Sequence, residues 1–204
     1  MSLLEEIEDV APSVFLLRGW ATPNDISSNC FFLKNEASGE LLLIDCGNAS
    51  ERTSREIKAA EKELGGEIAA AYCTHGHPDH VGGAKAVPSQ TPVFLSEKDF
   101  FLIPESERNR FTPLKADAVK FGDFDLKILR TPGHSLGSVC FWDEERRVLY
   151  SGDTLFANGA FGRTDLPGGD EKELFRSLDL IKKLGWRVLC PGHDEVERAE
   201  ASEK

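Results

Sequence analysis

Three imidazoles and one carboxylate lie within six residues in Thr74-His75-Gly76-His77-Pro78-Asp79-His80, a pattern of the form H-x-H-x-D-H. The pattern directly follows the apolar run 68–73, which is typical of a strand that delivers the next side chains to one edge of a sheet. Neutral imidazoles bind transition metals near pH 7, and a carboxylate adds a hard oxygen donor. A polar turn with histidines facing water is the alternative, but four donors at this spacing favour a metal site.

The rest of the histidines occur in a similar context. The chain has five histidines, and the other two are His134 in T-P-G-H-S and His193 in C-P-G-H-D. Each follows an apolar run, and Asp153 follows the apolar run 147–151 in the same way. Four strand ends therefore each present a residue that can ligate a metal, and we expect them to meet at one rim of the fold.

This order of motifs resembles the metallo-β-lactamase-fold hydrolase superfamily over about residues 29–193. The segments 152–156 (G-D-T-L-F) and 162–165 (G-R-T-D) resemble its glyoxalase II and persulfide dioxygenase branch. The resemblance implies a four-layer αββα sandwich with the metal site at one edge of its two sheets. The alternation of predicted strands and helices alone indicates only a mixed α/β fold.

The resemblance also implies a ligand set for two divalent ions, zinc in the first place, with iron or manganese as alternatives. The first ion is assigned His75, His77 and His134, the second Asp79, His80 and His193, and Asp153 bridges them. Asp79 is further expected to help to move a proton. Asp45, at the end of the apolar run 41–44, and Asp165 are expected to lie behind the ligands and to orient them, with a plain turn carboxylate as the alternative for Asp45.

Two divalent ions about 3.5–4 Å apart lower the pKa of a shared water towards about 7 from about 15.7. We therefore predict a hydrolase that uses a metal-activated hydroxide, with Asp79 and Asp153 as the catalytic carboxylates. The resemblance implies a thioester of the hydroxyacylglutathione type as its substrate. A persulfide dioxygenase is the main alternative, with one Fe(II) on His75, His134 and Asp153. A lactonase of the same superfamily and a metal-binding module without activity are further alternatives.

The substrate is less well defined by the sequence. Full-length glyoxalase II enzymes carry a helical C-terminal extension that binds glutathione, whereas residues 194–204 are all that follows His193 here, so we expect this extension to be absent. Arg163 is the candidate for binding a substrate carboxylate, and a salt bridge to Asp165 is its alternative role. Segment 98–114 is interpreted as a short core helix and a surface loop, with an apolar lid as the alternative.

Composition narrows the class of protein further. A chain of 204 residues with 40% hydrophobic content predicts one domain over 1–204. The net charge of -11 argues against a nucleic-acid partner. The resemblance implies a small-molecule substrate, such as a glutathione or other thiol derivative. No membrane span or signal peptide is predicted, so a cytoplasmic location is expected. Five cysteines without a C-x-x-C pair predict no disulfide framework, and a Cys-His nucleophile at Cys73 or Cys190 is a disfavoured alternative.

Hydrophobic patterning predicts the regular elements. Strands are expected at 14–17, 30–33, 41–44, 68–74, 92–95, 124–129, 138–142, 147–151 and 187–190. Helices are expected at 50–64, with Ser50 as its cap and Gly65 as its stop, from about 81, and from Asp170 to Gly185.

Overall fold

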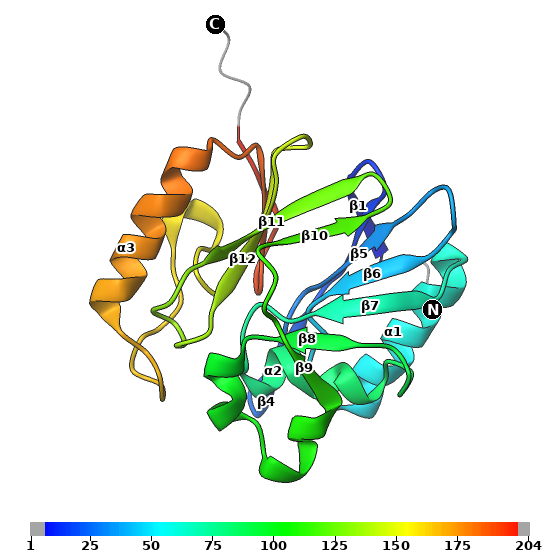
Figure 1. Ribbon diagram of the computed structural model, residues 1–204, viewed down its shortest axis with the longest axis horizontal. Coiled ribbons are helices and arrows are strands. Elements are labelled where there is room, and N and C mark those ends of the chain that lie inside the picture. Colours follow the sequence, from blue (N-terminus) through cyan, green and yellow to red (C-terminus); the bar gives the residue numbers. More distant parts are fainter. Residues whose placement is uncertain (1–6, 200–204) are drawn as a thin grey trace, which may run out of the picture.

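The computed structural model describes residues 7–199 and contains two large β-sheets that face each other (Figure 1). In spatial order, the first sheet consists of β1 (Ile7–Ala11), β2 (Val14–Leu17), β5 (Cys30–Lys34), β6 (Leu41–Ile44), β7 (Ile68–Tyr72), β8 (Val93–Leu95) and β9 (Phe111–Pro113). The second consists of β10 (Ala118–Phe121), β11 (Phe124–Arg130), β12 (Val139–Asp143), β13 (Val148–Gly152), β14 (Val188–Pro191) and β15 (Glu197–Arg198). The ends of the predicted domain, 1–6 and 200–204, lie outside the described residues.

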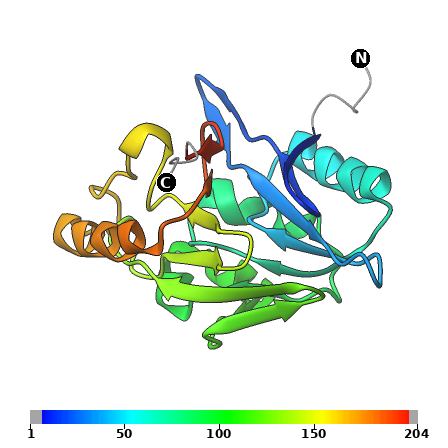
Figure 2. The same ribbon diagram turned by 90° about the horizontal axis from the view of Figure 1, so that it is seen from above.

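The two longer helices lie on the outer faces of the sandwich, one on each sheet (Figure 2). The longer ones are α1 (Glu51–Leu64) and α3 (Glu171–Ile181), and the shorter ones are α2 (Pro78–Val81), η2 (Gly82–Lys85), η3 (Glu97–Leu102), η4 (Glu105–Arg110), η5 (Ala157–Gly159) and η6 (Lys182–Leu184). A separate ribbon pairs β3 (Trp20–Thr22) with β4 (Asp25–Ser27). This arrangement confirms the expected αββα architecture. Within residues 7–199, every helix is too short or too polar to cross a lipid bilayer.

Three layers of apolar side chains hold the sandwich together, and β6 contributes to two of them. Its four residues are all buried. Leu41 and Leu43 pack towards α1, whereas Leu42 and Ile44 pack between the two sheets. A third cluster joins the second sheet to α3 through residues such as Leu174. A strand covered on both faces needs a continuous apolar run, which is the pattern that predicted β6.

The caps of α1 agree with its sequence. The Ser50 hydroxyl accepts a hydrogen bond from the backbone N–H of Thr53, and Gly65 ends the helix with a φ of 66°. A serine cap satisfies a donor that the first helical turn cannot, and glycine takes the left-handed conformation without steric cost. These contacts set the direction in which the chain re-enters the sheet at β7.

Strand direction brings the ligand-bearing segments to one edge. β11 and β13 are both antiparallel to β12, and β14 is parallel to β13. β11, β13 and β14 therefore run in the same direction and end at the same edge of the second sheet. The end of β7 meets them there, because the backbone N–H of Val139 donates to the carbonyl of Thr74 at 2.8 Å. A further bond from the N–H of Asn29 to the carbonyl of Gly192 at 2.7 Å joins the two sheets on the opposite side of the rim.

Segment 98–114 is more regular than the sequence predicts, because η3, η4 and β9 account for most of it. Ile103 and Phe111 are buried in the core beneath α1, whereas 47% of Phe101 is exposed. The apolar residues of this segment are thus divided between the core and the surface. The expected short core helix is wrong, because η3 buries only Asp99 and η4 buries none of its residues, while the core residues Ile103 and Phe111 lie outside both helices. The alternative of an apolar lid stays a prediction.

Candidate metal centre

All five histidines lie at the shared rim of the two sheets, together with Asp79 and Asp153. The donor atoms of three groups of three residues lie within 4.8 Å of one another: His75, His77 and His134; Asp79, His80 and His193; and His75, His80 and Asp153. The first two groups are the ligand sets expected for the two ions. The structure therefore brings together every predicted ligand, although these residues are separated by up to 118 positions along the chain (193 minus 75).

Asp153 lies between the two sets. Its Oδ1 is 3.2 Å from Nε2 of His80, and its Oδ2 is 3.5 Å from Nε2 of His134 and 3.6 Å from Nε2 of His193. A carboxylate has two oxygens that can each serve a different neighbour. The position of Asp153 is thus the one that a bridging ligand requires.

Unpaired buried atoms indicate that the cluster suits metal ions. Nε2 of His75, Nε2 of His77 and Oδ1 of Asp153 are buried without a hydrogen-bond partner among the described residues. In addition, Nδ1 of His77 and Nε2 of His134 face each other at 2.8 Å. Buried polar atoms in native proteins nearly always have a partner, and a cation satisfies several converging lone pairs at once.

The ring nitrogens that point away from the centre are held by the protein. Nδ1 of His80 lies 2.9 Å from Oδ2 of Asp45, and Nδ1 of His134 donates to the carbonyl of Arg163 at 2.7 Å. Nδ1 of His75 lies 3.1 Å from the hydroxyl of Thr74. Such contacts fix the tautomer and orientation of each ring and leave Nε2 for a metal.

Asp45 is held firmly in its position against His80. Its Oδ1 accepts a hydrogen bond from the backbone N–H of Thr74 at 2.7 Å, and its Oδ2 accepts one from the Thr74 hydroxyl at 2.9 Å. The backbone of Asp45 has a φ of 58°, a left-handed conformation that is uncommon for residues other than glycine. Such backbone strain is common where a side chain must be aimed at a functional site.

Two glycines allow the chain to pass close to the ligands. A Cβ added to Gly192 would lie 2.2 Å from Oδ1 of Asp153, and one added to Gly162 would lie 2.8 Å from Nδ1 of His134. Neither distance leaves room for a methyl group. The Gly162-Arg163 segment is therefore part of the site through its backbone.

Asp99 is a functional residue that the sequence did not reveal. It is fully buried and accepts three hydrogen bonds, from the backbone N–H of Gly76 at 2.9 Å, the hydroxyl of Ser135 at 2.6 Å and the backbone N–H of Gly137 at 2.6 Å. Burial raises its pKa, and the three donors oppose that rise. Because Gly76 and Ser135 belong to different ligand loops, Asp99 fixes the two loops relative to each other. A lone aspartate in an irregular segment gave no signal of this role.

The side chain of Arg163 lies on the surface in a two-pronged salt bridge with Asp165, with both N···O distances at 2.6 Å. The hydrogen bond from Arg163 lowers the pKa of Asp165 to about 2. This salt bridge is the alternative role expected for Arg163. A substrate carboxylate would have to compete with Asp165 for the guanidinium group of Arg163. Neither side chain contacts the histidines.

The cysteines lie near the rim but are poor nucleophiles. All five are buried and free. A hydrogen bond with Cys46 and burial raise the pKa of the Cys73 thiol well above its ordinary value, and burial raises that of Cys190. A nucleophilic cysteine must be a thiolate near neutral pH, so these environments argue against a Cys-His site.

The two sets differ in their affinity for protons. Burial lowers the pKa of His77 to about 4, and the neighbouring His134 contributes to this. Burial also opposes the protonation of His80, but the carboxylates of Asp153 and Asp45 more than offset it and raise the pKa of His80 well above its ordinary value. Near neutral pH and without metal, His77 is therefore neutral, whereas His80 has the higher affinity for a second proton.

We expect the two sets to load with metal at different pH values. A metal competes with a proton for each imidazole, so lowering the pH from about 8 to about 5 should empty the set that contains His80 first. Zinc stoichiometry after equilibrium dialysis at each pH should fall from two ions to one before the last ion is lost. Loss of both ions at the same pH would contradict this expectation.

Comparison with known proteins agrees with this geometry. The sequence profile of the metallo-beta-lactamase superfamily matches residues 23–193. The chain belongs to this superfamily. The metallo-beta-lactamase superfamily consists of metal-dependent hydrolases that bind divalent ions, so this membership accounts for the clustered histidines and carboxylates.

Individual members of the metallo-beta-lactamase superfamily share between 25% and 32% of their aligned residues with this chain. The hydroxyacylglutathione hydrolase GloC from Haemophilus influenzae is 32% identical over 168 residues, covering 74% of this chain and 76% of the relative. The crystal structure of TTHA1623 in a di-iron-bound form is 29% identical, with a TM-score of 0.69 and coverage of 87% of this chain and 92% of that one. ETHE1 from Myxococcus xanthus is 25% identical, with a TM-score of 0.68 and coverage of 89% and 78%.

Proposed function

We propose that this protein is a dinuclear metal-dependent hydrolase that cleaves thioesters. The observation that carries the proposal is the presence of two separate three-residue donor sets on either side of Asp153. The similarity to GloC, a hydroxyacylglutathione hydrolase, supports a thioester as the bond that is cleaved. The similarity to a di-iron protein supports two ions and makes iron an alternative to zinc.

The first ion would be held by His75, His77 and His134, and the second by Asp79, His80 and His193, with Asp153 shared. When bound, the ions supply a hydroxide nucleophile near neutral pH and polarise the carbonyl that it attacks. The protein's part is to keep the ligands oriented, which the contacts of His80 with Asp45 and of His134 with the Arg163 carbonyl achieve.

Asp79 is expected to act mainly as a ligand. Burial alone would raise its pKa, but a hydrogen bond from His193 at 3.0 Å and the charge of His80 lower the pKa well below the ordinary value. The group therefore stays ionised at neutral pH, which suits metal binding. The same low pKa makes Asp79 a weak proton acceptor, so its proposed part in proton transfer is secondary.

A persulfide dioxygenase with one Fe(II) on His75, His134 and Asp153 is the second candidate, because segments 152–156 and 162–165 resemble that branch. The dinuclear assignment accounts for more of the cluster, because Asp79, His80 and His193 also place their donor atoms within 4.8 Å of one another. This second donor set supports the hydrolase. A lactonase would use the same metal sites and differ only in its pocket.

Metal content and two assays on one sample test the proposal. Protein purified without added metal should contain two ions per chain by mass spectrometry and should cleave S-D-lactoylglutathione or another thioester. The control is the same protein stripped with a chelator, which should be inactive and recover on reloading. One iron per chain with oxygen uptake driven by glutathione persulfide would overturn the proposed hydrolase activity. Cleavage of lactones but of no thioester would identify a lactonase instead.

A further inference from the structure

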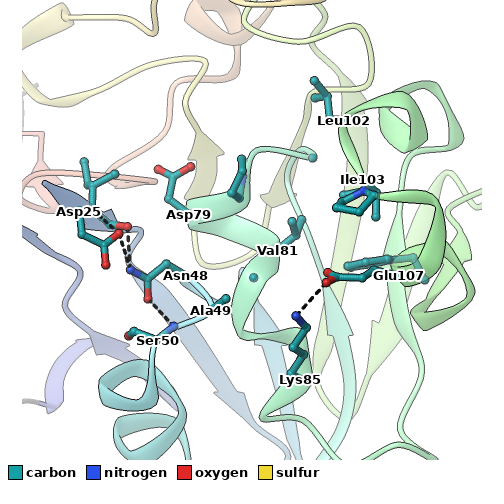
Figure 3. Close-up of a pocket in the computed structure, with 16 residues that line it drawn as sticks. Asp25, Asn48, Ala49, Ser50, Asp79, Val81, Lys85, Leu102, Ile103 and Glu107 are labelled. Atoms are coloured by element: carbon teal, nitrogen blue, oxygen red, sulfur yellow. Dashed lines mark hydrogen bonds and ion pairs between the residues drawn. The ribbon is translucent and has the colours of Figure 1, made fainter.

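A groove of about 730 Å³ opens beside the metal-ligand cluster and includes Asp79 among its lining residues. Figure 3 shows α2 running between two walls. One wall comes from β4 and the start of α1, around Asp25 and Asn48, and the other comes from η3 and η4, around Leu102 and Glu107. Because Gly76 and Asp79 line it, the groove borders the ligand loop of the proposed reaction centre.

Apolar side chains make up most of the surface of the groove. These are Ile26, Ala49, Pro78, Val81, Leu102 and Ile103. Ile26 is 42% exposed and Ala49 is also exposed, so part of this apolar surface faces solvent. A contiguous apolar surface next to a reaction centre usually marks the place where an apolar part of a ligand binds.

The charges of the groove oppose an anionic ligand. Lys85 is the single cation among the described lining residues, and its Nζ is paired with a carboxylate oxygen of Glu107 at 2.9 Å. Asp25 adds a second carboxylate, which accepts a hydrogen bond from the Asn48 amide at 3.0 Å, whereas the Asp79 carboxylate is assigned to the second ion. A glutathionyl group carries two carboxylates and one ammonium group, and the described lining offers its carboxylates no unpaired lysine or arginine.

We infer that this groove binds the uncharged, apolar acyl chain of the thioester, and that the enzyme prefers acyl groups with several methylenes over S-lactoylglutathione. The inference rests on the proposed thioester hydrolysis and specifies its substrate class. Each methylene that moves from water into the groove should raise kcat/KM by about two- to fourfold. The fourfold limit applies to a methylene that is fully buried. The acyl carbonyl then lies towards Asp79, where the groove reaches the ligand cluster.

The test uses a chain-length series on the metal-loaded protein. The probes are the acetyl, butyryl and hexanoyl thioesters of N-acetylcysteamine, an uncharged thiol, together with S-lactoylglutathione. We expect kcat/KM to rise from acetyl to hexanoyl and to exceed the value for S-lactoylglutathione. A flat or falling series, or faster cleavage of S-lactoylglutathione, would overturn the inference. Cleavage of none of the thioesters would overturn the proposed function itself.

Two variants test whether the groove is responsible for this preference. Ala49→Phe adds bulk to one wall and should lower the hexanoyl-to-acetyl ratio of kcat/KM by about tenfold. Leu102→Ala removes apolar surface from the other wall and should lower the same ratio by about threefold, which keeps the test decisive if Ala49→Phe fails to fold. Ala118→Phe is the matched control, because Ala118 is exposed on β10 outside the groove, and it should leave the ratio unchanged. An unchanged ratio in both groove variants would overturn the inference.

Discussion

The Asp153→Asn variant is expected to lose turnover by on the order of 10³-fold or more while keeping its fold. Asp153 places one oxygen 3.2 Å from His80 and the other 3.5 Å from His134. An asparagine of the same shape has one acceptor oxygen and no charge, so it cannot serve both donor sets. Among the substitutions considered, this one should have the largest effect on kcat.

Thioester cleavage, metal content and circular dichroism should be measured on the same preparation of Asp153→Asn. We expect less than two ions per chain and an unchanged spectrum, since the side chain does not pack in an apolar cluster. Asp117→Asn is a matched control, because the Asp117 side chain is 97% exposed and remote from the histidines. Full activity of Asp153→Asn would contradict both the bridging role and the dinuclear proposal.

The Asp99→Asn variant should have the second-largest effect, although Asp99 is not expected to touch a metal. The substitution replaces an acceptor oxygen with an amide that cannot accept from Gly76 or Gly137, so a buried donor is left unpaired. We expect the free energy of unfolding to fall by about 2–4 kcal/mol and Tm by about 10 °C. Zinc affinity should weaken by about 10–100-fold, because the two ligand loops lose the contact that fixes their spacing.

Thermal unfolding of the metal-free protein and calorimetric zinc titration separate these two consequences of Asp99→Asn. Asp125→Asn is the control, since the Asp125 side chain is 64% exposed and forms only a surface pair with Lys120 at 3.5 Å. A lower Tm with unchanged zinc affinity would show that Asp99 stabilises the fold without positioning the ligand loops.

The sequence allowed the elements with strong local patterns to be predicted. The expected strands at 14–17 and 41–44 have the bounds of β2 and β6, and the helix after Ser50 ends at Leu64 as expected. Runs of apolar residues and capping residues report on their own conformation, so these predictions needed no knowledge of the neighbours. The histidine-bearing turns could likewise be predicted as metal-ligand positions, because histidine is rare in this chain and occurs only after apolar runs.

The contacts that depend on distant partners were not predictable. β1, β3, β4, β9, β10 and β15 were missed, since none of them is a continuous apolar run and they gain their regularity by pairing with a neighbour. Asp99 was missed for a related reason, because its three donors come from loops that lie 23 to 38 residues away in sequence. The groove beside α2 also arises only when β4, α1 and η3 are brought together by the fold.

The walls of the groove and the metal ligands come from different stretches of the chain. Apart from α2 and the loop before it, which lines the groove through Gly76, the segments that form the walls contribute no ligand, and the ligand-bearing ends of β11, β13 and β14 contribute nothing to the walls. Mutations in β4 or η4 would thus alter which molecules are accepted without disturbing the atoms that perform hydrolysis. Such a division gives natural selection, or a protein engineer, a route to new substrate ranges on an inherited catalytic apparatus.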